Sequence, residues 1–573
     1  MDNNRRFFLA FLLTALVLVA ANYFFPSAPP PPAPVARSTP AAPSVVPTPA
    51  AGAPGAVATV GAAPAPAAAV ATLAVPAAPV ETVTVGTGRA AYRVSSLGGA
   101  LVGARMQGYR SLRPNVPNGT AVELARPGEA LLSYRLVVPG DTLALSQVPF
   151  RVTRNGTSVR LDGTASGRVA QNVPVSLTYA VQSDSFVVRV QGSVQGVTGP
   201  SFLLVDLPPT LAVTERDSLD HYTQLSFAWK PRSEGASGVA FAKLDPGERE
   251  FAEGPLTWAV TKSKYFLVGV LANPQQPFAE AAFTGGARTS KVATRAQGTV
   301  VLPLANGGFA FESYVGPQEW KRLVAMGRDF ENANPYGGWL QGLVQPFATI
   351  AIRFILWMHD NVKLSYGLVL VALGVLVRLV MWPLQQNMLR NQIKMQRIQP
   401  ELQIVQEKYK GDPQRFQQEM MKVYQSHGMS PFSPLTGCLP MLLPMPIFFA
   451  LFFVFQNTIE FRGVPFLWLA DISLKDPFYI LPIAVAATQF LMSWIGMRGT
   501  PPNPQTQMIT YMMPAMFLIF FLNVAAGLNL YYFVQNLVGL PQQWLLARER
   551  TKAGGTPVVQ GTAVKPTAKP SRA

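Results

Sequence analysis

The chain has 573 residues, of which 49% are hydrophobic and only 13% are charged, whereas soluble proteins carry about 25% charged residues. Because the uncharged residues gather into long runs, this composition excludes an ordinary soluble protein and predicts a membrane protein. The formal net charge is +17, but the basic residues are not interleaved with aromatic ones, so no nucleic-acid target is expected. Anionic lipids, or a ribosome at the membrane surface, are the partners that this charge favours.

Few residue types that carry metal or nucleotide chemistry are present. Cys438 is the single cysteine, so neither an internal disulfide nor a cysteine-based metal site is expected. The three histidines, His221, His359 and His427, are far apart and form no ligand pattern. No GxxxxGK[ST] motif occurs, which argues against nucleotide hydrolysis. We therefore expect no cofactor and no metal.

The first 80 residues divide into an anchor and a linker. Within residues 1–25, Arg5-Arg6 comes first, and Phe7–Phe25 follow as roughly 19 residues without a charge. This run is longer than the apolar core of a cleavable signal peptide, about 7–15 residues, so we interpret it as an uncleaved transmembrane anchor. The two arginines predict a cytoplasmic N-terminus. Residues 26–80 are rich in proline and alanine and are expected to form an extended linker.

Residues 81–330, called the outer domain below, show the alternation of β-strands. The apolar residues Val175, Leu177, Tyr179 and Val181 share one face, and a polar turn at 182–185 leads into a second apolar run. Alternation on both sides of a polar turn predicts a β-hairpin. Because such patterns recur over about 250 residues, we expect one large all-β sandwich.

Apolar segments follow the outer domain. Residues 338–360 include Pro346 and Arg353 and are interpreted as a helix lying in the membrane interface. A second span is expected at 361–389, and the third to sixth spans within 429–547. The last uncharged stretch is too long for one crossing and divides at Asn523–Asn529. The fold class predicted is a membrane α-helical bundle of six spans, five of them forming a core, with the β-sandwich outside.

Charge in the connecting segments sets the orientation. Basic residues outnumber acidic ones in the loop 390–428 and in the tail 548–573, whereas acidic residues dominate between the third and fourth spans. The positive-inside rule then places both termini in the cytoplasm and the outer domain in the periplasm. The protein is thus expected to be a multi-pass protein of the bacterial inner membrane.

The loop 390–428 has the pattern of a helical hairpin. Ile398, Leu402 and Val405 repeat at helical spacing, and a second amphipathic run follows Gly411-Asp412-Pro413. Glycine ends helices, aspartate caps them and proline suits the first turn. The hairpin is either a packed structural element or a docking arm for incoming chains. Its candidate contact residues are basic: Arg390, Lys394, Arg397, Lys408 and Lys410.

Arg378 is the single charge between Leu364 and Leu389, in the second span. A charge at mid-bilayer costs about 2.5–3.5 kcal/mol and usually faces a cavity. The alternative is that its side chain extends to the cytoplasmic headgroups, since Trp382-Pro383 is only about 6 Å further along the helix. Other polar residues of the spans favour a wet groove open to the cytoplasm: Gln385, Gln386, Thr488, Gln489, Asn529, Tyr531, Tyr532, Gln535 and Asn536.

The third span is rich in proline, and the third and fifth spans are rich in methionine. Pro434, Pro440, Pro444 and Pro446 each remove a backbone donor from the third span. Methionine surfaces suit varied apolar partners, although methionine is more often filler in a helix bundle. The residues that we expect to form an apolar path for a client helix are Met441, Met445, Phe448, Met512 and Met516.

Several motifs resemble those of one known family. They are Tyr314–Pro317, Ser365-Tyr366-Gly367, Val377-Arg378 with Pro383, Gly437–Met441, Met445–Phe449, Gly527-Leu528, and Leu530–Tyr532 with Asn536. Together with the anchor, the outer domain and the five-span core, they resemble the YidC/Oxa/Alb family of membrane protein insertases over nearly the whole chain.

The resemblance implies a role for individual residues. Arg378 corresponds to the groove arginine and Tyr532 to the aromatic residue that faces it. Two positions depart: Gly374 stands where threonine is usual, and Pro444 where glutamine is common, so this groove is expected to be less polar. The outer domain of the family resembles the sugar mutarotase sandwich. Mutarotase chemistry uses two histidines, and this domain has only His221, so no such activity is expected.

The predicted function is that of a non-enzymatic insertase and chaperone, which inserts and helps fold nascent membrane proteins without ATP. The ribosome and the Sec translocon are candidate partners. A small-solute transporter is one alternative, but it would need acidic residues in the spans or an inverted repeat, and the predicted spans contain no Asp or Glu. An envelope-assembly scaffold is the other.

Overall fold

The structure is a computed structural model that describes residues 80–553 except 115, 118, 289–291, 335–340, 429–444 and 499–503. The expected anchor, nearly all of the linker and most of the basic tail therefore lie outside the described residues. So do Met441, Pro444 and much of the predicted third span. Among the basic residues of the hairpin, the side chains of Arg390, Lys394 and Arg397 are also not described.

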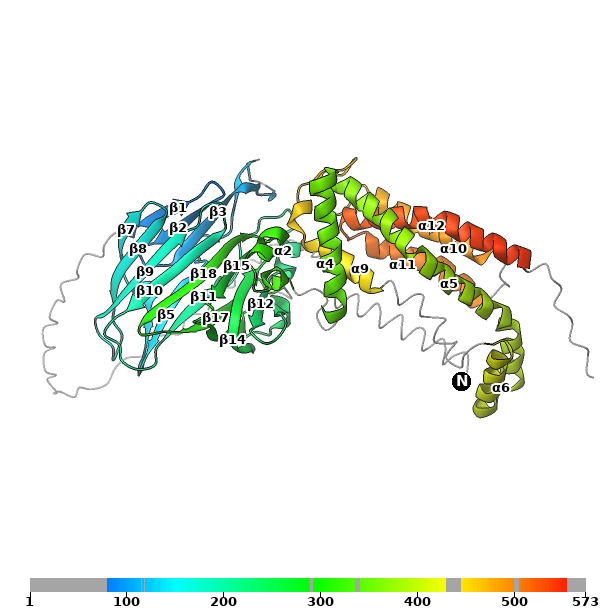
Figure 1. Cartoon of the computed structure of the whole chain (residues 1–573), viewed down its shortest axis with the longest axis horizontal. Coiled ribbons are helices and arrows are strands. Elements are labelled where there is room, and N and C mark those ends of the chain that lie inside the picture. Colours follow the sequence, from blue (N-terminus) through cyan, green and yellow to red (C-terminus); the bar gives the residue numbers. More distant parts are fainter. Residues whose placement is uncertain are drawn as a thin grey trace, which may run out of the picture. The chain divides into compact units, whose positions relative to one another are not determined.

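The outer domain is the expected all-β sandwich (Figure 1). A four-stranded sheet has the order β1-β2-β3-β4, and a 14-stranded sheet has the order β6-β5-β11-β17-β16-β14-β15-β18-β10-β9-β8-β7, with β12 pairing β13 and β14. Its strands are β1 (Thr82–Gly86), β2 (Ala90–Ser95), β3 (Leu101–Arg110), β4 (Ala121–Glu123), β5 (Ser133–Val138), β6 (Asp141–Ala144), β7 (Arg151–Asn155), β8 (Ser158–Ala165), β9 (Val173–Val181), β10 (Val187–Val194), β11 (Phe202–Leu207), β12 (Ser226–Pro231), β13 (Ser237–Ala240), β14 (Arg249–Lys262), β15 (Phe266–Ala272), β16 (Phe278–Gly285), β17 (Ala296–Pro303) and β18 (Gly308–Pro317).

The predicted hairpin is confirmed as β9 and β10, which pair antiparallel. The apolar face of β9 is buried from Val175 to Val181, whereas Ser176 and Thr178 are only half-buried. Tyr179 is also anchored through its hydroxyl, which donates to the Gly99 carbonyl oxygen at 2.6 Å. Strands alternate faces in this way because successive side chains point to opposite sides.

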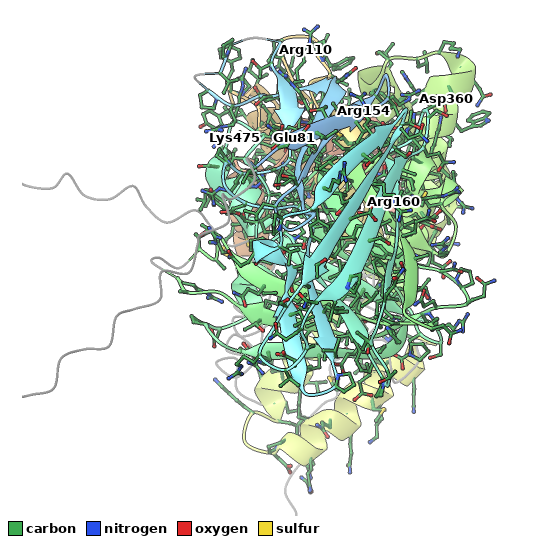
Figure 2. All side chains as sticks on the ribbon, turned by 90° about the vertical axis from the view of Figure 1, so that its left-hand side faces the viewer. Glu81, Arg110, Arg154, Arg160, Asp360 and Lys475 are labelled. Carbon is green, nitrogen blue, oxygen red and sulfur yellow. The ribbon has the colours of Figure 1, made fainter. Side chains whose placement is uncertain are left out.

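Charged residues protect the edge of the large sheet. β7 is an edge strand, and it carries the exposed arginines Arg151 and Arg154. Figure 2 shows Arg154 on this strand and Arg160 on the neighbouring β8. Charges on an edge strand discourage pairing with a second chain.

Helices make up most of the rest of the described chain (Figure 1). The α-helices are α2 (Ser218–Thr223), α3 (Trp320–Ala325), α4 (Gln341–Trp357), α5 (Tyr366–Lys408), α6 (Pro413–Ser426), α9 (Met445–Asn457), α10 (Ile480–Met497), α11 (Pro504–Phe521) and α12 (Ala526–Ala553). The 3₁₀-helices are η1 (Leu145–Gln147), η2 (Phe241–Lys243), η3 (Phe330–Ala333) and η6 (Ile459–Phe461), and η5 (Met358–Val362) is a π-helix.

Three described helical segments are long and apolar enough to cross a membrane, namely Gln341–Val362, Tyr366–Asn387 and Ile480–Met497. α9 and the segment Thr510–Phe521 are shorter apolar helices. The first of the three includes α4, for which we predict an interfacial position. α4 packs against α9 and leaves Leu343, Phe347 and Ile350 exposed, an apolar face suited to lipid in either position. Its placement and the number of spans remain predictions.

The helical hairpin continues directly from the second span. α5 is one helix of 43 residues, so the expected boundary at residue 390 is not marked by a helix end. No helix-ending glycine lies there, and Pro383 does not end the helix. The turn follows at Gly411-Asp412-Pro413 as predicted: Asp412 caps α6 by accepting from the Arg415 backbone N–H at 3.1 Å. Ile398 and Phe416, from the two predicted apolar faces, are buried.

Candidate functional site

α5 and α12 lie in close contact at Gly374. A Cβ at this position would lie 3.1 Å from Val534 Cγ1 and 3.2 Å from the Tyr531 carbonyl oxygen. These distances are shorter than ordinary van der Waals contacts, so a larger residue would require its neighbours to move. The departure from threonine at this position therefore accompanies a close approach of the two helices.

Arg378 lies one helical turn further along α5, and its side chain is buried. The residue is 7% exposed, and its Nη2 donates to Gln542 Oε1 on α12 at 3.0 Å. The Nε atom is buried without a hydrogen-bond partner among the described residues. Gly539 makes room for the guanidinium, because a Cβ there would lie 2.5 Å from Arg378 Nη2. None of the ion pairs between described residues involves Arg378.

Gln542 is the residue of this site that the sequence analysis missed. It is 1% exposed, and its Nε2 donates to the Trp382 carbonyl oxygen on α5 at 3.2 Å. The two hydrogen bonds hold the amide between the guanidinium and the backbone of the same helix. One signal was present: Gln542 follows Gln535 by seven residues, which places both on one face of α12.

The other predicted groove residues fall into three groups. Tyr531 is buried, and its hydroxyl accepts from Gln535 Nε2 at 2.6 Å. Asn536 is directed to α10, where its Nδ2 donates to Thr488 Oγ1 at 3.3 Å. Tyr532 packs with Phe448 of α9 at a ring-centroid distance of 5.5 Å. Gln385 and Gln489 are half-buried. In this conformation α5 and α12 bring together Arg378, Gly374, Tyr531 and Gln535, whereas Asn536 and Tyr532 contact other helices.

The predicted apolar path maps onto α9 and α11. Met445 and Phe448 are half-buried on α9, and Met516 is half-buried on α11. Phe448 contacts Phe520 of α11 at a centroid distance of 5.7 Å. Met512 is 44% exposed. These positions form an apolar surface on two helices, and their role as a path for clients remains a prediction.

Two of the predicted basic contact residues have described side chains, and both are exposed: Lys408 at the end of α5 and Lys410 in the turn that follows. Lys408 Nζ lies 5.5 Å from the centroid of the Tyr409 ring. Exposed cations attract anionic partners, and binding of such a partner by the hairpin remains a prediction.

A second buried arginine lies where the outer domain meets the loop between α9 and α10. Arg462 Nε and Glu215 Oε1 are 2.8 Å apart, and both side chains are 5% exposed. Arg462 also donates to the carbonyl oxygens of Arg110 and Thr214 at 2.9 and 3.3 Å. Local sequence patterns contained no signal for this pair, because its members are 247 residues apart.

Comparisons with known proteins cover both parts of the chain. The model of a family described as the 60Kd inner membrane protein matches residues 357–553, and that of the YidC periplasmic domain matches residues 82–350. A membrane protein insertase YidC of Anaeromyxobacter dehalogenans strain 2CP-1 is 30% identical over 487 residues, which cover 82% of this chain and 86% of the relative. Another, from Anaeromyxobacter sp. strain Fw109-5, is 34% identical over 304 residues, 52% of this chain and 53% of the relative.

Among solved structures, the chain is similar to the crystal structure of an active YidC insertase with its first transmembrane domain resolved. The match has a TM-score of 0.33 and 18% identity, and it covers 81% of this chain and 94% of that one. The relatives are named as insertases rather than enzymes, and the family models describe an inner membrane protein with a periplasmic domain. On the family models and the 30% identical relative, the chain belongs to the YidC family of membrane protein insertases.

Proposed function

We propose that the chain inserts nascent integral membrane proteins and helps them fold, without ATP, through a hydrophilic groove that opens between α5 and α12 toward the cytoplasm. The observation that carries the proposal is the state of Arg378: it is buried, and its recorded partner is a neutral amide. A buried charge without a counter-ion is costly. It therefore offers a favourable site for an incoming carboxylate.

The first step would exchange one partner of Arg378 for another. The bond to Gln542 already involves the charged guanidinium, and a hydrogen bond to a charged group contributes about 1.5–3 kcal/mol, so the gain from a carboxylate comes from its opposite charge. A client carboxylate that replaced Gln542 Oε1 would also neutralise the guanidinium. Separation of α12 from α5 would expose Tyr531 and Gln535 beside it, so that polar client groups meet polar partners.

The second step would transfer the apolar client segment to lipid along α9 and α11. A helix of about 20 residues at about −0.5 kcal/mol per residue gains about 10 kcal/mol on insertion. This partition free energy exceeds the cost of moving a short polar tail, so no nucleotide is needed to drive the step. The insertase lowers the barrier by offering partners to the polar groups on the way.

The proposal extends to orientation and partners. Both termini and the α5–α6 hairpin would lie in the cytoplasm, where the hairpin and the basic tail meet a ribosome or anionic lipids. The Sec translocon would be a partner for clients with large translocated domains. These contacts rest on charge and on the resemblance to the family.

The test is insertion into vesicles reconstituted with the purified chain and no ATP. Arg378→Ala is expected to slow the insertion of clients with acidic tails at least tenfold, and to affect neutral tails much less. Arg378→Lys retains the charge and should restore part of the rate. Arg498→Ala removes an exposed arginine at the end of α10 and serves as the matched control. Equal rates for Arg378→Ala and Arg498→Ala would refute the role of the guanidinium.

A further inference from the structure

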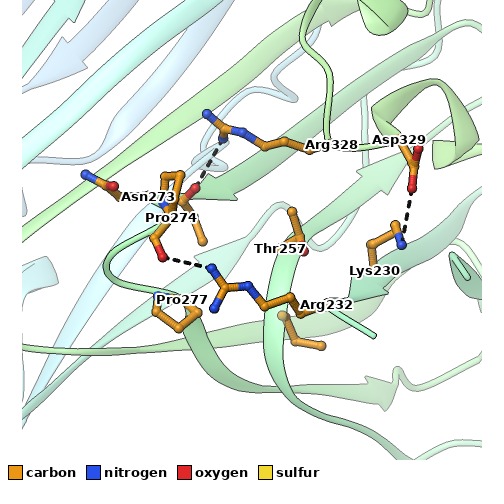
Figure 3. Close-up of a pocket in the computed structure, with 10 residues that line it drawn as sticks. Lys230, Arg232, Thr257, Asn273, Pro274, Pro277, Arg328 and Asp329 are labelled. Carbon is orange, nitrogen blue, oxygen red and sulfur yellow. Dashed lines mark hydrogen bonds and ion pairs between the residues drawn. The ribbon is translucent and has the colours of Figure 1, made fainter. Parts of the chain in front are cut away.

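A small cavity in the outer domain is lined by three cationic side chains. It has a volume of about 260 Å³ and is bounded by β12, β14, the turn between β15 and β16, and the segment after α3 (Figure 3). Lys230, Arg232 and Arg328 line it together with one carboxylate, that of Asp329. The rest of the lining is mostly apolar or uncharged: Leu256, Thr257, Ala272, Asn273, Pro274 and Pro277.

The cations are only partly neutralised. Arg328 Nη2 donates to Glu312 Oε2 at 3.0 Å, and Lys230 Nζ lies 3.4 Å from Asp329 Oδ2, whose side chain is 62% exposed. Arg232 has no ion pair among the described residues; its Nη2 donates to the Pro274 carbonyl oxygen at 3.0 Å (Figure 3). The pocket therefore keeps an excess of positive charge beside an apolar surface.

The backbone that places Arg328 and Asp329 is strained. Gly327, Arg328 and Asp329 have φ angles of 65°, 60° and 54°, so three consecutive residues are left-handed. For residues with a side chain this conformation costs about 1 kcal/mol or more each, and such strain gathers at ligand clamps. Trp258 holds the segment, since its Nε1 donates to the Arg328 carbonyl oxygen at 3.0 Å. Arg328 Nη1 also donates to the Ala272 carbonyl oxygen at 3.2 Å.

We propose that this pocket binds a small oxyanion with a short apolar stem, such as the carboxylate end of a peptide. The unpaired Arg232 would take the oxyanion, because a guanidinium offers parallel donors to carboxylate or phosphate oxygens. Leu256, Pro274 and Pro277 would contact the stem. The size suits a group as large as one side chain. A sugar is disfavoured, because none of the described residues that line the pocket offers an aromatic ring for stacking.

The site is independent of the groove between α5 and α12, so its test does not use insertion. Calorimetric titration of the full chain in detergent micelles would compare butyrate, inorganic phosphate and butyramide. We expect one saturable butyrate site per chain, with a Kd on the order of 1 mM as for a ligand of few atoms, and at least tenfold weaker binding of butyramide. Phosphate binding more tightly than butyrate would assign the site to phosphate groups instead of carboxylates.

Two variants complete the test. Arg232→Gln should weaken oxyanion binding at least tenfold, and Arg232→Lys should retain part of it. Arg249→Gln removes an exposed charge at the start of β14, outside the pocket, and should bind butyrate as the unmodified chain does. Because Arg232 is exposed, its replacement leaves the core of the domain intact. Absence of saturable binding, or equal binding by the Arg232→Gln and Arg249→Gln variants, would overturn the proposal.

Discussion

Two buried arginines of this chain have opposite surroundings. The side chain of Arg462, in the loop between α9 and α10, is 5% exposed, and its Nε lies 2.8 Å from the equally buried carboxylate of Glu215 in the outer domain. Arg378, between α5 and α12, is 7% exposed and bonds the neutral amide of Gln542. Arg462 already has a counter-ion and would have to lose it to bind another carboxylate. Arg378 has only a neutral partner, and a carboxylate in its place would neutralise the charge. This difference suits Arg378 to the binding of transient clients.

The outer domain and the apolar helices differ in the same way as Arg462 and Arg378. In the outer domain, ion pairs join neighbouring strands, such as Arg135 with Asp206 at 2.5 Å. A further pair, Lys264 with Asp220 at 2.7 Å, links the β14–β15 turn to α2. The parts of α5 and α12 on either side of Arg378, residues 366–387 and 526–547, contain no Asp or Glu, and neither do α9, α10 and α11, so none of these segments can supply a counter-ion for Arg378. The unpaired state of Arg378 thus follows from the composition of its neighbours.

The largest effect that we expect comes from breaking the ion pair of Arg462 with Glu215. Arg462→Ala leaves the buried carboxylate of Glu215 without its counter-ion and with the hydrogen bond from the Thr214 hydroxyl, and removal of one partner of a buried ion pair usually costs about 3–5 kcal/mol. The free energy of unfolding of the outer domain in the full-length chain, measured by hydrogen exchange, should fall by this amount. Arg189→Ala, which removes an exposed pairing with Glu312, is the control and should cost less than about 1 kcal/mol. Similar losses for both variants would show that burial does not distinguish them.

Glu460, in η6, is a buried carboxyl group whose ionisation should make the unfolding free energy depend on pH. Burial raises the pKa of its carboxyl to about 7; the Trp320 backbone N–H donates to Oε1 at 3.3 Å, and Oε2 is buried without a partner among the described residues. The neighbouring charge of Glu319 also raises the pKa, and that of Lys321 lowers it. Tyr109 and Tyr366 lie close enough to interact with the carboxylate.

The sign follows from a folded-state pKa above the ordinary value of 4.5. The stability linked to this group is fully present below about pH 4.5 and is lost as the pH rises through about 7, up to about 3 kcal/mol. Glu460→Gln should therefore match the unmodified chain in acid and exceed its unfolding free energy at pH 8. Glu250→Gln, at an exposed position of β14, should show no such difference. A pH-independent effect of Glu460→Gln would contradict the raised pKa.

Sequence patterns predicted the features that depend on near neighbours. The alternation from Val175 to Val181, the cap at Asp412 and the interruption between α11 and α12 each arise from a few adjacent residues. The pair of Arg462 with Glu215 joins positions 247 residues apart, and Gln542 acquires its role only when α12 packs on α5. Local periodicity carries no information about such contacts, because it fixes which face a residue occupies and not what lies opposite. The sequence motifs thus indicated Arg378 but not its partner.

A substitution of Gln542, the partner of Arg378, tests the role of Arg378 directly and has the smallest expected effect. Gln542→Glu is nearly isosteric and would place a carboxylate 3.0 Å from Arg378 Nη2, where the amide oxygen now lies. The variant should be about as stable as the unmodified chain, since the counter-ion that Arg378 gains offsets the lost hydrogen bond from the amide Nε2 to the Trp382 carbonyl oxygen. Its insertion of clients with acidic tails should nevertheless fall about tenfold, equivalent to about 1.4 kcal/mol of lost binding.

The matched control for this variant is the next residue. Gln543 is half-buried and faces Gly496 of α10, with its Oε1 3.6 Å from where a Cβ would lie, so Gln543→Glu adds the same charge away from Arg378. If neutralisation of Arg378 is what matters, Gln543→Glu keeps its activity while Gln542→Glu loses it without loss of folding. Were both variants to insert acidic-tailed clients at the unmodified rate, Arg378 would have to act without binding carboxylates. The different partners of Arg378 and Arg462 would then reflect packing and not client binding.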